Sequence, residues 1–296
     1  RHILGAQGAL WTEYITTERH AEYMVFPRLS ALAEVTWTNS KHKSWARYSK
    51  TLPQITQRYQ QMGINVSTSA FNPRSQVKLT KAGQLQLVLS TDIAEQNIFF
   101  TVNGDKVAPY SAPTYLYKKP INITKPTQVR IATESAQGRA LFGDVRVDLA
   151  PHKALGKNIS FVNPPRSGIE RILDGVMAYQ QYYNVDDFAV FYDVDLDAVI
   201  DFEQATEISQ VKMGIDAGRH RQLHPPISVE VLTSNDGENW QSQLKMKAEE
   251  IKGPLLTLNF SPVTQRFVRV IAVNAKNSSD AQIPELPLYI DEIAVY

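Results

Sequence analysis

Trp11 and Glu13 have side chains suited to holding a ligand by stacking and hydrogen bonding. They lie at the end of the apolar run Ile3–Trp11, whose lack of alternation is typical of a strand buried on both faces of a parallel sheet. Residues two apart on a strand share a face. An indole offers a flat apolar surface, and a carboxylate accepts strong hydrogen bonds. The same pattern fits a packed tryptophan beside a capping glutamate, so a structural role stays open.

Metal and thiol chemistry have little support in the sequence. The chain has no cysteine, which excludes disulfides, thiolate ligands and cysteine nucleophiles. His220 and His224 have a metal-like spacing, but two prolines follow and no third ligand is near, so zinc is not predicted. The run 193–197 begins like an EF-hand loop, but Ala198 and Gln204 replace the required glycine and glutamate.

Composition indicates a folded, nearly neutral chain. Of 296 residues, 43% are hydrophobic and 21% are charged, both within the globular range. Lys plus Arg number 31 against 30 Asp plus Glu, without a basic block, so neither nucleic acid nor an anionic membrane surface is a predicted partner. No apolar stretch is long enough for a membrane span. The expected ligand is neutral.

The pattern of the chain predicts three parts, with boundaries at 1–66, 67–150 and 151–296. The first continues from the strand into an amphipathic helix beginning after Thr17 and a second helix over about 43–62, with Gly63 as its stop. Both later parts consist of short β-type runs broken by Gly, Pro, Asn and Asp, which is typical of all-β domains.

The first part resembles the end of the catalytic barrel of glycoside hydrolase family 20, the β-N-acetylhexosaminidases. The resemblance rests on Trp-x-Glu at Trp11 and Glu13, followed at 27–37 by Pro-Arg-Leu-x-Ala-Leu-Ala-Glu-x-x-Trp. It implies the fold class of a multidomain chain: the last strand and helices of a (β/α)8 barrel, a small β sandwich of the chitobiase type, and a discoidin-like jelly roll.

This resemblance assigns Trp11 and Glu13 to the pocket of the terminal N-acetyl sugar. It also implies retaining hydrolysis in which the substrate's acetamido oxygen is the nucleophile and an upstream Asp-Glu pair assists. That pair lies in a His-x-Gly-Gly-Asp-Glu type motif, which this sequence lacks. The sole Asp-Glu dipeptide, Asp291-Glu292, lies in an apparent strand. We therefore expect no catalytic residue in this chain and no activity of the chain alone.

Residues 158–296 resemble a discoidin-like, galactose-binding-type domain through motifs such as Leu173-Asp174-Gly175 and Asp291-Glu292-Ile293. Such modules in bacterial glycosidases bind glycans through aromatic and polar residues in loops at one end. Candidates here are Tyr179, Tyr182, Tyr183, Arg219, His220 and His224. Aromatic loop residues also serve as core lids, so glycan binding and packing are both open readings.

The same resemblance implies a structural calcium between Asp174 and Glu292. A frequent oxygen donor two residues after the aspartate is replaced by Val176, which weakens such a site. No cofactor is required by the predicted chemistry, and calcium is the expectation that this resemblance adds.

The leading hypothesis is the C-terminal part of an exported β-N-acetylhexosaminidase. Its partners would be glycans with terminal N-acetylhexosamine and the upstream remainder of the barrel. Export, to the periplasm, cell surface or exterior, is implied by the resemblance alone. The alternative is a non-catalytic carbohydrate-binding or scaffolding fragment that acts through the jelly roll.

Overall fold

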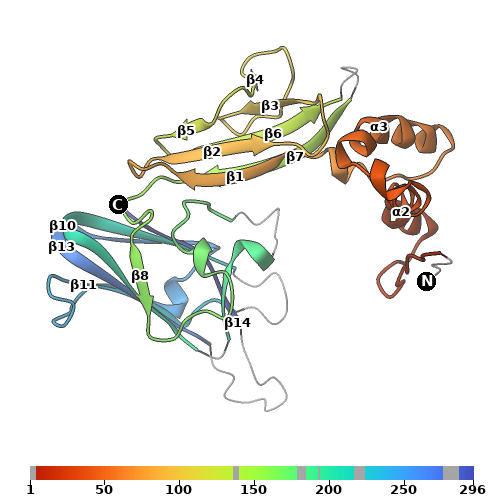
Figure 1. Ribbon diagram of the computed structural model, residues 1–296. Helices are drawn as coiled ribbons and strands as arrows, with labels where there is room; N and C mark the ends of the chain where they lie inside the picture. Colours follow the sequence, from red (N-terminus) through yellow and green to blue (C-terminus); the bar gives the residue numbers. More distant parts are fainter. Residues whose placement is uncertain (1–4, 136–139, 179–184, 193, 217–223, 276–286) are drawn as a thin grey trace. The chain divides into compact units, whose positions relative to one another are not determined.

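The computed structural model of the chain describes residues 5–135, 140–178, 185–192, 194–216, 224–275 and 287–296. The chain divides into two compact units (Figure 1). Unit 1 comprises Arg1–Ser75, Leu89–Lys119 and Arg130–Val145, and unit 2 comprises Gln76–Val88, Pro120–Val129 and Arg146–Tyr296. The boundaries expected after residues 66 and 150 stay predictions, as does the separate small sandwich.

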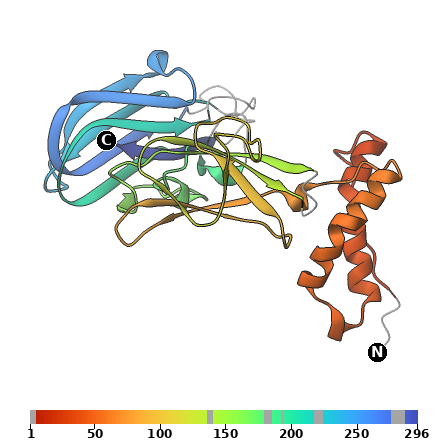
Figure 2. The same ribbon diagram turned by 90° about the horizontal axis from the view of Figure 1, so that it is seen from above.

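Unit 1 begins with three helices, which lie close together in Figure 2: α1 (Glu18–Val25), α2 (Arg28–Trp37) and α3 (Trp45–Gln61). Thr17 caps α1 as predicted, with its hydroxyl accepting from the N–H of His20 at 3.2 Å. Where the sequence predicted one helix over 17–37, Pro27 separates two, because proline has no N–H to continue the hydrogen-bond ladder.

The expected strand over Ile3–Trp11 is not present in its described part, residues 5–11. A strand exists through hydrogen bonds to neighbouring strands, and no described strand pairs with this segment. The helices that follow are present. The barrel-end assignment of this segment therefore rests on its sequence and not on its backbone pairing.

A four-stranded sheet follows, in the order β4-β3-β6-β7. Its members are β3 (Asn97–Thr101), β4 (Tyr115–Leu116), β6 (Thr127–Glu134) and β7 (Leu141–Leu149). Within unit 1, α3 packs through Tyr48 and Leu52 against Phe71 and Ile93, with Phe142 of β7 beside them. This core connects the last helix to the sheet.

Unit 2 contains a three-stranded sheet in the order β1-β2-β5, formed by β1 (Arg74–Leu79), β2 (Leu85–Ser90) and β5 (Ile121–Ile123). It also contains a seven-stranded sheet in the order β12-β11-β13-β10-β14-β9, with β8 paired to β10. These strands are β8 (Asn158–Phe161), β9 (Ala189–Tyr192), β10 (Leu196–Ile215), β11 (Ser228–Ser234), β12 (Gln241–Lys247), β13 (Leu255–Val273) and β14 (Pro287–Val295).

Two long strands, β10 and β13, carry the core of unit 2 (Figure 1). The first half of β10 pairs with β8 and its second half with β14, and the register with β13 shifts between Asp201 and Thr206. Glu203 there has φ 67°, a left-handed conformation that bends the strand. The all-β character predicted for this region is confirmed.

Short 3₁₀ segments complete the described structure: η1 (Ser40–His42), η2 (Ser69–Phe71), η3 (Ile169–Arg171), η4 (Val185–Asp187) and η5 (Ala248–Glu250). None of the described helices has the length and apolar character that crossing a membrane requires.

Candidate functional site

Trp11 and Glu13 lie in an irregular segment before α1. The N–H of Ile15 donates to the carbonyl of Thr12 at 3.0 Å and closes a turn around Glu13. Trp11 is 85% exposed, and Glu13 is exposed as well. A Cβ added to Gly8 would lie 3.4 Å from Leu32, which places the segment beside α2. Both side chains are accessible, and their joint role in binding stays a prediction.

The helices next to this segment leave apolar side chains uncovered. Neither α1 nor α2 contains a buried residue. Trp37 is 91% exposed and Tyr14 is 80% exposed, and Leu29 and Val35 are exposed too. Several large exposed apolar side chains on one short stretch make it a candidate interaction surface.

In unit 2, Asp174 and Glu292 come together, as predicted, and Asp291 joins them. Glu292 Oε2 accepts from the N–H of Gly175 at 2.6 Å, and Asp291 Oδ2 accepts from the N–H of Ala178 at 2.5 Å. The carboxyl groups of Asp174 and Glu292 lie near enough that the charge of Asp174 helps to raise the pKa of Glu292. Two neighbouring residues of β14 therefore hold the turn that carries Asp174.

His152 lies against this carboxyl cluster. Its Nε2 is 3.0 Å from Glu292 Oε1, and both side chains are fully buried. Its Nδ1 accepts from the N–H of Ala154 at 3.2 Å, so the proton of the neutral ring is on Nε2. The N–H does not align with the carboxyl, and within the described part of the chain His152 Nε2 and Glu292 Oε1 have no hydrogen-bond partner.

Burial controls the charge of the cluster. It raises the pKa of Asp174 to about 6 and that of Asp291 to about 8. Burial, followed by the charges of Asp174 and Asp291, raises the pKa of Glu292 well above its ordinary value. Burial also lowers the pKa of His152 to about 3. A neutral imidazole therefore lies beside carboxyl groups that hold their protons more strongly than usual.

The carboxyl oxygens of the cluster decide whether it fits calcium. Calcium takes about six to eight oxygen ligands, and carboxyl groups supply oxygens of that hard type. Glu292 Oε1 is an unpartnered oxygen, whereas Asp174 Oδ1 and both oxygens of Asp291 already accept backbone N–H groups. Among the residues that the structure describes, no three His, Asp or Glu side chains form a metal-holding group. The donor type fits, and calcium itself stays a proposal.

Sequence reasoning missed the roles of His152, Gly214 and the Asp291 side chain in this cluster. A Cβ at Gly214 would meet Asp291 Oδ1 at 1.5 Å, so only glycine leaves room for the carboxyl group. The Asp-Glu dipeptide was a visible signal, but nothing local marks His152 or Gly214. The proximity of Gly214 to Asp291 depends on how β10 and β14 pair.

The predicted glycan-binding residues fall mostly outside the described residues. This applies to Tyr179, Tyr182, Tyr183, Arg219 and His220. His224 is described and exposed, followed closely by the buried Pro226. An exposed imidazole is compatible with ligand contact, and the role stays a prediction.

Comparison with known proteins confirms the resemblance noted in the first part of the chain. Residues 1–40 match the family model of the glycosyl hydrolase family 20 catalytic domain. The matched segment includes Trp11 and Glu13. A beta-hexosaminidase of Porphyromonas gingivalis is 30% identical over 125 residues, covering 38% of this chain and 15% of that protein. A beta-hexosaminidase of Vibrio vulnificus is 43% identical over 54 residues, covering 17% of this chain and 6% of that protein.

The chain spans 15% or less of the length of these curated relatives. Among solved structures, a chitosan-binding module from a chitosanase/glucanase of Paenibacillus sp., solved in complex with chitotriose, is 18% identical. The match covers 49% of this chain and 98% of that one, with a TM-score of 0.35. The family resemblance thus rests on the sequence matches, of which the match to the family model covers residues 1–40.

Proposed function

We propose that the N-terminal segment completes the catalytic domain of a β-N-acetylhexosaminidase that removes terminal N-acetylhexosamine from glycans. The observation that carries the proposal is the match of residues 1–40 to the family 20 catalytic domain. The exposed indole of Trp11, two residues before the exposed carboxylate of Glu13, supports it. Export to the periplasm, cell surface or exterior is part of the same proposal.

Trp11 and Glu13 would bind the sugar and not react with it. The indole face would pack on C–H groups of the terminal sugar, and the carboxylate of Glu13 would accept hydrogen bonds from its hydroxyls. The acetamido oxygen of the substrate would act as nucleophile with retention, assisted by an Asp-Glu pair. Asp291 and Glu292 are buried in β14, so they are unsuited to that task. The pair would come from the upstream remainder of the barrel.

The exposed apolar side chains of α2 support the proposal that the upstream remainder of the barrel packs against this segment. Trp37, Leu29 and Val35 expose apolar surface on α2, which the helices and strands of a barrel would bury. Burial of that surface would also position the segment that carries Trp11. The chain alone is therefore expected to be inactive.

Hydrolysis of a chromogenic N-acetyl-β-glucosaminide tests the proposal. The 296-residue chain should be inactive, and a longer protein carrying the upstream sequence should be active. In the longer protein, Trp11→Ala should lower kcat/KM by about 100-fold or more, because the sugar loses its orienting wall. Tyr115→Ala is the control, since this exposed aromatic lies outside the segment and helices proposed to meet the barrel. Undiminished turnover in Trp11→Ala would falsify the assignment.

A non-catalytic role through residues 151–296 is the alternative. The observation in its favour is that His224, the glycan-binding candidate among the described residues, is exposed. Binding of the chain to a glycan array, lost in both Tyr182→Ala and His224→Ala, would support carbohydrate binding by this region. Absence of binding to every glycan would leave a scaffolding role.

We also propose a structural calcium held by Asp174 and Glu292. Support comes from the proximity of the two carboxyl groups, the burial of Glu292 and its unpartnered Oε1. A cation would neutralise carboxyl groups that otherwise retain protons. Its role would be to fix the turn at Asp174 to β14.

A further inference from the structure

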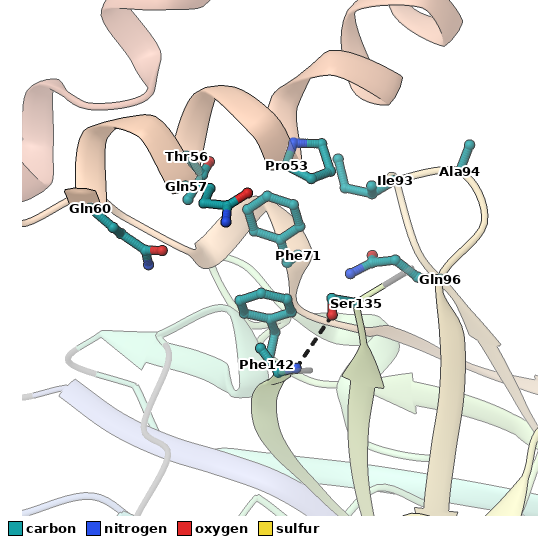
Figure 3. Close-up of a pocket in the computed structure, with 11 residues that line it drawn as sticks. Pro53, Thr56, Gln57, Gln60, Phe71, Ile93, Ala94, Gln96, Ser135 and Phe142 are labelled. Atoms are coloured by element: carbon teal, nitrogen blue, oxygen red, sulfur yellow. Dashed lines mark hydrogen bonds between the residues drawn. The ribbon is translucent and has the colours of Figure 1, made fainter. Parts of the chain in front are cut away.

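A cavity of about 300 Å³ lies within unit 1, between α3, η2, the loop before β3 and the ends of β6 and β7 (Figure 3). Its walls include Phe71 and Phe142, whose rings stack with centroids 4.7 Å apart. The volume is at the lower end of the range for small-molecule sites. The cavity can therefore hold a ligand of about one sugar residue.

Two polar atoms on the cavity wall have no hydrogen-bond partner in the described structure. They are Oγ1 of Thr56 and Nε2 of Gln96. Thr56 is only 4% exposed. Unsatisfied buried polar groups are rare in native proteins because each forfeits its hydrogen bonds to water. Two in one cavity indicate that something else occupies it and bonds to both.

The orientation of the Gln96 amide is fixed by Thr91. The hydroxyl oxygen of Thr91 accepts from the N–H of Ile93 at 3.2 Å, and the hydroxyl donates to Gln96 Oε1 at 2.6 Å. This leaves the amide nitrogen as the free end, and Figure 3 shows it turned toward the space beside Phe71 and Phe142. The cavity thus presents a fixed N–H donor.

The chemistry of the wall selects against a charged ligand. No charged side chain is among the described residues that line the cavity, and the remaining polar groups include the neutral amides of Gln57 and Gln60. Among these described residues an ion would find no counter-charge, and burial of an unpaired charge is strongly unfavourable. Aromatic walls favour an apolar group, and the two unpartnered atoms favour a group with one acceptor and one donor.

We propose that this cavity binds the acetamido group of a neutral N-acetylated sugar. The amide carbonyl accepts from Gln96 Nε2, the acetamido N–H donates to Thr56 Oγ1, and the methyl group packs against Phe142. The choice of an N-acetylated sugar rests on the function proposed above, whereas the cavity itself is formed by residues other than Trp11 and Glu13. It would be a second, non-catalytic sugar site.

Titration of the ¹⁵N-labelled chain with N-acetylglucosamine tests the proposal through side-chain amide resonances. The Gln96 resonance is assigned by its absence from the spectrum of Gln96→Leu. N-acetylglucosamine should shift it, whereas glucose, which lacks the acetamido group, and cationic glucosamine should not. If N-acetylglucosamine leaves this resonance unmoved, the proposal is overturned and the cavity holds ordered water.

Two variants separate binding from packing. Thr56→Val and Gln96→Leu should each weaken N-acetylglucosamine binding about tenfold, the factor for one hydrogen bond of ordinary net strength. Thr51→Val and Gln54→Leu are matched controls on exposed positions of α3, and they should bind as the parent chain does. A purely structural role predicts that Thr56→Val changes thermal stability but not affinity. Unchanged affinity in both cavity variants would overturn the proposal.

Discussion

His152 Nε2 lies 3.0 Å from Oε1 of Glu292, with both side chains fully buried. Burial keeps the imidazole neutral, since it lowers the pKa of His152 to about 3. The ring packs beside the carboxyl cluster that fixes the turn at Asp174 to β14. The contact therefore joins the segment after β7 to the last strand of the chain.

Loss of the His152 ring should destabilise unit 2. We expect His152→Ala to lower the free energy of unfolding by about 2–4 kcal/mol, because it leaves a cavity and removes the acceptor of the Ala154 N–H. Urea denaturation measures the change. The matched control is His224→Ala, an exposed histidine of the same unit, which should change stability by less than about 0.5 kcal/mol. Equal effects of the two substitutions would contradict the buried role of His152.

A side chain at position 214 should displace Asp291. A Cβ there would lie 1.5 Å from Asp291 Oδ1, so Gly214→Ala should lower the free energy of unfolding by about 1–3 kcal/mol. Gly5→Ala is the control, since nothing lies within 4 Å of a Cβ at Gly5.

A double variant tests the cause of that loss. Adding Asp291→Ala to Gly214→Ala removes the carboxyl group that the new Cβ meets. The double variant should then be less destabilised than the sum of the single variants, as expected for two residues in direct contact. Additive effects would mean that the clash is relieved elsewhere.

Stability should fall with rising pH in the presence of a chelator. The pKa of Asp291 is raised from 3.8 to about 8 by burial, so the folded chain keeps a proton that the unfolded chain has released. This contribution is full below pH 3.8 and is lost as pH rises through about 8. Above its ordinary pKa of 6.5, His152 is neutral in both states and adds no slope.

Thermal unfolding between pH 6.5 and about 8 excludes His152 and reports Asp291 together with Glu292, whose raised pKa gives a slope of the same sign. The melting temperature of the parent chain should decrease over this interval. Asp291→Asn keeps the size of the side chain and removes its titration, so its melting temperature should depend less on pH. The same slope in both proteins would show that Asp291 does not titrate there.

Calcium should stabilise the chain if Asp174 and Glu292 hold it. We expect the melting temperature to rise with added Ca²⁺ and to return to its calcium-free value on chelation, because a ligand that binds only the folded state stabilises it. Asp174→Asn and Glu292→Gln should abolish the rise, whereas Asp105→Asn, an exposed aspartate in unit 1, should retain it. A parent chain indifferent to Ca²⁺ would refute the calcium proposal.

Local sequence signals determined the family resemblance and most of the elements. Trp11, Glu13 and the motif at 27–37 predicted a resemblance to family 20, and residues 1–40 match the model of its catalytic domain. Thr17 and Gly63 marked helix ends, because capping depends on neighbouring backbone groups. The apolar run at 3–11 predicted a strand wrongly over its described part, because a strand requires partners that periodicity does not reveal.

Only the tertiary structure brought distant residues together. His152 meets Glu292, Gly214 makes room for Asp291, and Thr56 shares a cavity with Gln96. Each contact joins residues far apart in the chain, and its formation depends on strand register and helix packing. Register and packing depend on the whole set of long-range contacts, whereas sequence patterns indicate local preferences.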